Sequence, residues 1–447
     1  MRHLTPWAFA HIITLVVCVA WLPNRPVVGQ QTAPSKPMES LEAEDVSHAT
    51  TDWLRWRGPH DNGSIAGTCF PSALDPEKAL WKAELTGKGC STPITVEGKI
   101  YLTAPDGDKD SLVCFDSTGK QLWQTAFGKQ DAGKHRNGSG SNASPASDGT
   151  AVYVYFKSGT LAAVNLDGSV RWKKNLTEIY GKANLYWDHG TSPVVTKKYV
   201  VMARMHEGDS WVAAFDKTDG KEVWKVARNF KTPREGDHGY STPVVLDRDM
   251  KESLLVYGAE QLTRHDATTG EAYWSCGNFN PDKAELWPTI ATPAVIDGIA
   301  VVAAGRNDRR QPLLYGVSLA GNGDVTETGH VWKRDDTGTF VPSPAVLDGN
   351  VYLLRDLGEF ECIDPSTGKT IWEGKFPKHR KKFYCSPLIA GDKLYAIRED
   401  GVMFVADISD GSLNVLSEHK LGESVIGSPI PLGDHILVRS ESHLYCF

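Results

Sequence analysis

The sequence predicts an all-β fold, an eight-bladed β-propeller of four-stranded antiparallel blades, and two observations support this. The first is a repeat in which a Ser or Thr followed by Pro occurs eight times, with successive prolines 42 to 52 residues apart. The pairs are Thr92-Pro93, Ser144-Pro145, Ser192-Pro193, Thr242-Pro243, Thr292-Pro293, Ser343-Pro344, Ser386-Pro387 and Ser428-Pro429. The second is the repeat length, which is that of a propeller blade. We therefore expect one ring of eight blades over residues 80–447.

Each repeat contains several short strands separated by turns. A few apolar residues follow the proline, and then come an Asp-Gly type turn, a β-branched or aromatic run such as 151–155, and a segment that ends in Asp or Asn. Asp and Gly suit the turns because Asp bonds its own backbone and Gly tolerates positive φ. Most repeats then place a Trp four residues after a turn glycine, which is typical of propeller blades. The tryptophans expected to pack between blades are Trp81, Trp123, Trp172, Trp224, Trp274, Trp332 and Trp372.

The two ends of the repeat region predict how the ring closes. The last repeat begins at Pro429 and stops at Phe447, which leaves room for three strands only. Residues 80–85, which contain Trp81, precede the first repeat and resemble the missing outer strand. Pairing them with the C-terminal strands would complete the eighth blade and remove an open edge that invites aggregation. An open solenoid is the alternative.

The first 79 residues are expected to form three segments outside the propeller. Residues 1–29 have a weakly basic start and an apolar stretch at 8–22. This pattern is typical of a secretory signal peptide, with an apolar core of up to ~15 residues, whereas a spanning helix needs ~20. We expect a periplasmic or secreted protein that is not an integral membrane protein, with a retained N-terminal anchor as the alternative. Residues 30–51 are predicted to be a flexible linker, and residues 52–79 an N-terminal extension.

Composition argues against some classes of partner. The net charge is −7, and about −9 without the signal segment, so a nucleic-acid partner is not expected. The one basic run, at 378–382, is interpreted as a solvated loop rather than a docking patch. Cys114, Cys362 and Cys446 occupy a repeat position that Ala fills elsewhere, which indicates small core residues. We expect a monomer, and the spacing of the cysteines demands no disulfide.

The repeat pattern resembles a known family. The succession Ser/Thr-Pro, Asp-Gly, aromatic run, Leu-x-x-x-Asp and Thr-Gly-x-x-x-Trp is similar to that of the pyrroloquinoline-quinone-like β-propellers, over about residues 80–447. The segment Trp53-Leu54-Arg55-Trp56-Arg57-Gly58-Pro59 resembles the leader of a secreted branch of that family. The family includes quinoprotein alcohol dehydrogenases and a periplasmic (BamB-like) scaffold of the outer-membrane β-barrel assembly machinery. The resemblance therefore implies two different functions.

The dehydrogenase interpretation can be compared with individual residues. Those enzymes carry two adjacent cysteines beside the quinone, a Ca²⁺ held by carboxylate and amide oxygens, and an Asp base. In this chain no two cysteines are adjacent, and no c-type haem attachment pattern is present. We therefore expect no cofactor and no catalytic residues. Pyrroloquinoline quinone with Ca²⁺ is expected only under the alternative interpretation.

Propeller geometry predicts where a ligand would bind. All eight loops that lead into the inner strands share one face, and those before blades two to four are the most polar. The candidate binding residues on this rim are Asn142, Asp188, His189, Asp237, His238 and Tyr240. They form either a small-molecule, glycan or metal site, or polar loops satisfied by water and by one another. Their spacing matches no metal-binding pattern, so no metal is expected.

Two functions follow from these observations. The leading hypothesis is an exported, non-catalytic propeller that binds a protein or another envelope component through its rim. The alternative is a quinone-dependent oxidoreductase, or a small-molecule or glycan binder, that uses the channel mouth. A fold shared by both kinds of protein does not decide between them.

Overall fold

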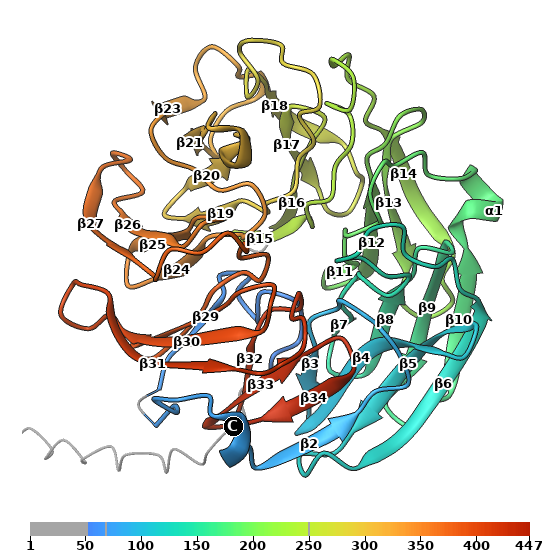
Figure 1. Ribbon diagram of the computed structural model, residues 1–447. Coiled ribbons are helices and arrows are strands. Elements are labelled where there is room, and N and C mark those ends of the chain that lie inside the picture. The colour runs from blue at the N-terminus through green and yellow to red at the C-terminus, as the bar shows by residue number, and fades with distance from the viewer. Residues whose placement is uncertain (1–51, 68, 249–250) are drawn as a thin grey trace, which may run out of the picture. The chain divides into compact units, whose positions relative to one another are not determined.

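The computed structural model describes residues 52–67, 69–248 and 251–447, which belong to one compact unit that spans Thr50–Phe447. Its sheets form the predicted eight-bladed propeller (Figure 1). The predicted signal peptide and linker lie outside the described residues. No helix within the described residues is long and apolar enough to span a bilayer.

Each of the first four blades has four antiparallel strands, which follow one another from the channel outward. Blade 1 contains β3 (Ile94–Val96), β4 (Lys99–Asp106), β5 (Lys109–Phe115) and β6 (Gln121–Lys129). Blade 2 contains β7 (Ala146–Ser147), β8 (Ala151–Tyr155), β9 (Thr160–Asn165) and β10 (Val170–Asn175). Blade 3 contains β11 (Val194–Val195), β12 (Tyr199–Arg204), β13 (Trp211–Asp216) and β14 (Glu222–Ala227). Blade 4 contains β15 (Val244–Arg248), β16 (Lys251–Gly258), β17 (Gln261–Asp266) and β18 (Ala272–Cys276), with β22 (Gly323–Asp324) added at its outer edge.

The other four blades repeat this order. Blade 5 contains β19 (Ala294–Ile296), β20 (Ile299–Ala303), β21 (Leu314–Ser318) and β23 (His330–Arg334). Blade 6 contains β24 (Ala345–Leu347), β25 (Asn350–Leu354), β26 (Glu359–Ile363) and β27 (Thr370–Lys375). Blade 7 contains β28 (Leu388–Ala390), β29 (Lys393–Ile397), β30 (Val402–Asp407) and β31 (Asn414–Lys420). Blade 8 contains β32 (Ile430–Leu432), β33 (His435–Arg439), β34 (His443–Cys446) and β2 (Trp81–Glu84).

The eighth blade confirms the predicted closure. Its outer strand β2 pairs antiparallel with β34, and Trp81 lies opposite Cys446 in the register. Figure 1 shows the two strands side by side, although they come from opposite ends of the propeller sequence. Short helical turns lie outside the blades: η1 (Pro76–Lys78), α1 (Leu176–Tyr180) and η2 (Asn307–Arg309).

The Ser/Thr-Pro pairs form a closed ring of hydrogen bonds around the channel. In each blade the backbone N–H of the Ser or Thr donates to the hydroxyl of the corresponding residue in the next blade, at 2.9–3.0 Å. The last bond, from Ser428 N to Thr92 Oγ1, joins blade 8 to blade 1 and completes the circle. All eight Ser or Thr residues are buried. The proline that follows favours an extended backbone at the Ser or Thr, which helps to hold its N–H in position.

The repeat tryptophans connect each blade to the next. The indole N–H of Trp172 donates to Lys217 O at 2.9 Å, and that of Trp224 donates to Ala267 O at 3.2 Å. Trp81, Trp274 and Trp332 donate in the same way to Ser117, Leu319 and Pro365. Trp123 and Trp372 lie against Gly168 and Gly411 of the following blade. The indole of each repeat tryptophan thus spans the boundary between neighbouring blades.

The turn glycine is required by the tryptophan of the preceding blade. Gly220 has a φ of +70°, and a Cβ at this position would lie 2.6 Å from the ring of Trp172. The same close approach occurs between Gly270 and Trp224. In each Gly-x-x-x-Trp segment, the glycine therefore receives the tryptophan of the preceding blade, and the tryptophan packs on the glycine of the following blade.

The N-terminal extension covers the end of the channel opposite the inner-strand loops. Its β1 (Ser64–Ile65) pairs parallel with β28, and Trp53 and Leu54 accept hydrogen bonds from Thr95 and Ser147 at the ends of inner strands. The guanidinium of Arg57 donates to Pro344 O and Pro387 O, at 2.8 and 2.9 Å. Beside Arg57, where the segment packs on the Ser/Thr-Pro pairs of blades 3 to 5, only about 10 Å³ of space remains. A cavity of about 620 Å³ lies further out, between residues 54–61 and blades 2 to 5. We call residues 53–65 the plug.

The ring of hydroxyls predicts a specific destabilisation. Ser192→Ala removes the acceptor for the buried Ser144 N–H, and an unsatisfied buried donor costs about 1–3 kcal/mol. We expect the free energy of unfolding in urea to fall by this amount. Ser192→Thr is the matched control, because Thr occupies the same position in three other blades, and it should be close to neutral. An equal loss in the two variants would contradict the role of the hydroxyl.

The tryptophans between blades predict a larger effect. Trp172→Ala removes a ring that is only 8% exposed together with its hydrogen bond, and should cost about 3–5 kcal/mol in the free energy of unfolding. Trp187→Ala, at a ring that is 39% exposed, is the control and should cost far less. Denaturant unfolding of the two variants checks this, and equal stabilities would show that Trp172 does not join the blades.

Candidate functional site

The loops that lead into the inner strands form one face of the propeller, which we call the mouth face. The plug closes the opposite end. A cavity of about 330 Å³ opens on the mouth face, and we call it the mouth cavity. Its lining includes Asn142, Asp188 and Tyr240 from the predicted rim, together with Trp187, Arg306, Asp308, Asp356, Lys382 and Tyr384. Side chains from blades far apart in the sequence therefore meet there.

The predicted rim residues do not all line this cavity. Asn142, Asp188 and Tyr240 do, whereas His189 lines a second cavity on the outer side of the same loop. His238 is buried, and its Nδ1 accepts a hydrogen bond from Tyr186 N at 3.3 Å. Asp237 lies 3.9 Å from His238 Nε2 and belongs to neither lining. The structure thus brings three of the six residues together at the mouth.

Asp188 fixes the shape of the rim. Its carboxylate accepts hydrogen bonds from the backbone N–H groups of Lys134 and His135, at 2.8–3.0 Å, and pairs with Lys157 Nζ at 2.9 Å. Burial alone would raise the pKa of Asp188, but the N–H groups of His135 and Lys134 and the Lys157 ammonium together lower it. The carboxylate is therefore ionised and joins the loops that lead into blades 2 and 3.

The other charged groups of the mouth cavity are also engaged. Arg306 forms a bidentate pair with Asp308, at 2.8 and 2.9 Å, and its guanidinium lies 4.2 Å from the ring centre of Phe340. The buried Asp356 accepts from Phe340 N and Val341 N, at 2.8 and 3.2 Å. Burial raises the pKa of Asp356, against the opposing effect of these hydrogen bonds. Only Lys382 contributes a cation to this lining without an ion pair among the described residues.

Two exposed aromatic residues at the mouth were not among the predicted site residues. Tyr186 and Trp187 are 58% and 39% exposed, and their rings meet edge to face at 4.6 Å. Their backbone is fixed, because Trp187 N donates to the Tyr240 hydroxyl at 3.0 Å and Tyr186 N to His238. The signal in the sequence was two adjacent aromatic residues inside a loop rather than a strand.

Comparisons with known proteins agree with this architecture. A family model described as "Outer membrane protein assembly factor BamB" matches residues 72–209 and 208–447. The chain belongs to this family. BamB from Yersinia pestis is 24% identical over 349 residues, which is 73% of this chain and 76% of that protein.

Solved structures show the same fold. BamB from Moraxella catarrhalis superposes with a TM-score of 0.53 at 17% identity, over 79% of this chain and 98% of that one. The quinohemoprotein alcohol dehydrogenase from Comamonas testosteroni superposes with a TM-score of 0.65 at 13% identity, over 89% of this chain and 80% of that one. At these identities the likeness concerns the fold alone. The BamB family and the dehydrogenases share it.

The mouth cavity does not fit pyrroloquinoline quinone with Ca²⁺. The quinone carries three carboxylates, yet the cavity pairs its one arginine with Asp308 and adds the carboxylates of Asp188 and Asp356. Among the described residues, no three His, Cys, Asp or Glu side chains gather as a metal site. Cys90, Cys114, Cys276, Cys362, Cys385 and Cys446 are free thiols rather than a disulfide beside the cavity. We therefore derive no step through this cofactor.

The network around Asp188 predicts a pH-dependent stability. Because its pKa is lowered in the folded state, Asp188 stabilises the fold above the pKa of an unfolded Asp, about 3.9, and this contribution is lost as the pH falls through the lower folded pKa. Asp188→Asn should cost about 1–3 kcal/mol in unfolding free energy at pH 7. The difference from the wild type should shrink in acid. Asp237→Asn, at a half-buried carboxylate, is the control. A constant difference between Asp188→Asn and wild type across pH would contradict the prediction.

Proposed function

We propose that this protein is a non-catalytic binding module of the cell envelope, and that it docks a protein partner through the mouth face. The observation that carries the proposal is the pair Tyr186 and Trp187. Both rings are exposed on this face, and hydrogen bonds from their backbone to Tyr240 and His238 hold them in place. Exposed aromatic side chains on a fixed backbone are typical of residues that dominate protein interfaces.

The electrostatics of the mouth support binding rather than catalysis. A catalytic base or acid needs a titratable group that can reach substrate, with its pKa tuned to the task. In this cavity the carboxylates of Asp188 and Asp356 each accept hydrogen bonds from two backbone N–H groups. The carboxylate of Asp308 is paired with Arg306. These carboxylates are occupied in shaping the rim on which the aromatic pair is presented.

The family indicates the class of partner. Its members in Yersinia pestis and in Moranella endobia are named as assembly factors for outer membrane proteins. We infer that the partner is likewise a protein of the envelope that takes part in assembling other proteins. An exported location follows from the same inference and agrees with the signal peptide expected from the sequence.

The aromatic pair gives a direct test. The double variant Tyr186→Ser with Trp187→Ser should capture the partner from an envelope extract about thirtyfold less tightly, because loss of an interface hot spot costs about 2 kcal/mol or more. The matched control is Ile371→Ser, which changes a side chain of similar exposure, 53%, on the outer strand of blade 6. The variants should keep the wild-type melting temperature. Equal capture by both variants would contradict docking through this face.

The same proteins test the enzymatic alternative, which the shared fold with the quinohemoprotein dehydrogenase keeps open. Purified protein is mixed with pyrroloquinoline quinone and Ca²⁺, and dye reduction is followed with a panel of alcohols. We expect no bound chromophore and no reduction. Alcohol-dependent reduction that is lost in Asp308→Asn would contradict the non-catalytic part of the proposal.

A further inference from the structure

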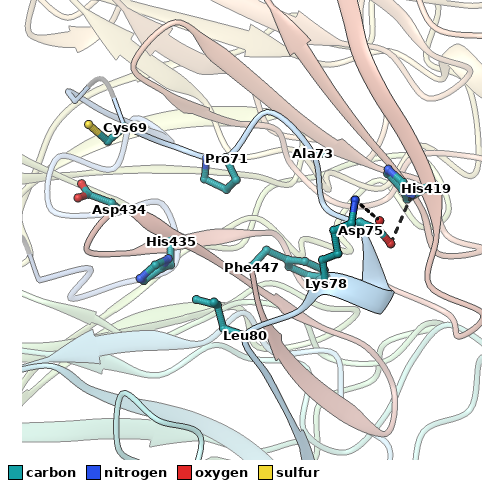
Figure 2. A pocket seen from close by; sticks show the side chains of 10 residues that line it. All are labelled: Cys69, Pro71, Ala73, Asp75, Lys78, Leu80, His419, Asp434, His435 and Phe447. Atoms are coloured by element: carbon teal, nitrogen blue, oxygen red, sulfur yellow. Dashed lines mark ion pairs between the residues drawn. The ribbon is translucent and has the colours of Figure 1, made fainter.

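Two of the cavities outside the mouth are lined by several charged side chains. The first, of about 410 Å³, lies where residues 69–80 meet blades 7 and 8 (Figure 2). Figure 2 shows Asp75 between Lys78 and His419, at 3.4 and 3.9 Å, with Asp434 and His435 across the cavity. None of the buried polar atoms that lack a partner belongs to this lining. It therefore gives no indication of a missing ligand.

The second cavity differs in this respect. It has about 300 Å³ and lies between the loop that leads into blade 2, the β8–β9 turn and the chain from α1 to β11. We call it the side cavity. His189 lines it, is 6% exposed, and has an Nδ1 that is buried with no hydrogen-bond partner among the described residues. A buried polar atom without a partner is costly, and it indicates a group that the protein alone does not supply.

The charges around the side cavity are mostly positive. Lys129, Lys134, Lys157 and Lys182 line it, against the single carboxylate of Asp131. Lys157 is neutralised by Asp188 and Asp131, at 2.9 and 3.6 Å. Lys134 Nζ contacts only a carbonyl, Leu185 O, at 3.3 Å. Three ammonium groups thus lack a carboxylate partner in the described part of the chain.

A buried arginine strengthens this positive field. Arg204 is 1% exposed, and its Nε and Nη1 have no hydrogen-bond partner among the described residues, while Nη2 donates to Tyr180 O at 3.1 Å and the guanidinium lies 4.9 Å from the ring centre of Trp211. It lies behind the cavity wall and acts electrostatically on His189. Burial, together with the nearby charges of Arg204 and His206, lowers the pKa of His189 to about 3, so the ring is neutral. Buried cations without a counter-charge favour an anion nearby.

We propose that the side cavity binds the oxyanion of a sugar-sized ligand. The lysines and the neutral His189 offer hydrogen-bond donors to a carboxylate, sulfate or phosphate group. Trp187, which also lines the cavity, offers a flat apolar wall for the ring that carries the anion. The volume lies at the lower end of that of small-molecule sites. This goes beyond the docking function, since the ligand of this cavity is a small molecule and the cavity lies on the other side of the Trp187 loop.

Calorimetric titration of the whole protein at constant ionic strength tests the proposal. The probes are glucuronate, glucose 6-sulfate and glucose 6-phosphate, with glucose and inorganic sulfate for comparison. We expect one site per chain for at least one anionic sugar and none for glucose. The affinity should fall as NaCl is added, because salt screens the lysines. The sugar that binds identifies the oxyanion.

Variants locate the site. Lys182→Met and Lys134→Met should each weaken binding by at least about tenfold, as expected for loss of a hydrogen bond to a charged group. His189→Gln should do the same, and a thermal melt checks that its fold is retained. Lys173→Met, at an exposed lysine on β10 outside the lining, is the matched control and should not change binding.

Three outcomes would overturn the proposal. The first is the absence of binding by every anionic probe. The second is unchanged binding in Lys182→Met with Lys134→Met, which would place the site elsewhere. The third is equal affinity for inorganic sulfate and glucose 6-sulfate, which would remove the role of the sugar ring and of Trp187. Partner capture through the mouth face is measured separately, so either function can fail alone.

Discussion

The ring of eight hydrogen bonds between the Ser/Thr-Pro pairs is the constraint on which the rest of the propeller depends. Each hydroxyl accepts from the N–H of the preceding blade, and the bond from Ser428 to Thr92 closes the circle. The inner strands converge at the axis, where the buried backbone N–H of each Ser or Thr has no neighbour within its own sheet. The hydroxyl satisfies it at every blade. A blade that lost this acceptor would leave a buried donor unpaired. The closed ring therefore fixes the distance between neighbouring blades, and with it the position of the loops on the mouth face.

The fold was predictable because these contacts repeat in the sequence. The period gave the number of blades, and the short last repeat gave the closure by Trp81. The pattern did not show which residues of neighbouring blades contact one another. The spacing from Gly220 to Trp224 suggested one local unit, whereas Gly220 receives the ring of Trp172 from the preceding blade. The hydroxyl of each pair was visible in the sequence, but its acceptor role requires the distance between blades, which a single repeat does not contain.

The sequence predicted the face of the propeller that carries the candidate site, but not which side chains line the cavity there. Register places the loop residues before each proline on the mouth face, but it does not say whether a side chain points toward the axis or away from it. Asp188 and His189 are consecutive, and neighbouring residues of an extended chain face opposite sides. Asp188 accordingly lines the mouth cavity, and His189 lines the side cavity. Tyr186 and Trp187 were not among the predicted residues, because the repeat pattern assigns no contact to an aromatic residue that lies in a loop.

The plug decides which end of the propeller is available for function. Arg57 is buried and bonds to the carbonyls of Pro344 and Pro387, which belong to the same Ser/Thr-Pro pairs that form the ring. Burial lowers its pKa to about 9, against the opposing charge of Asp61, and the guanidinium stays protonated at neutral pH. The plug is thus fastened to the ring at the end of the channel opposite the mouth face. On the mouth face, Trp187 stands between the mouth cavity and the positively charged side cavity, since it lines both. A protein that docks on the rings of Tyr186 and Trp187 and a small anion behind them would share one wall, the Trp187 loop, whose position Asp188 fixes.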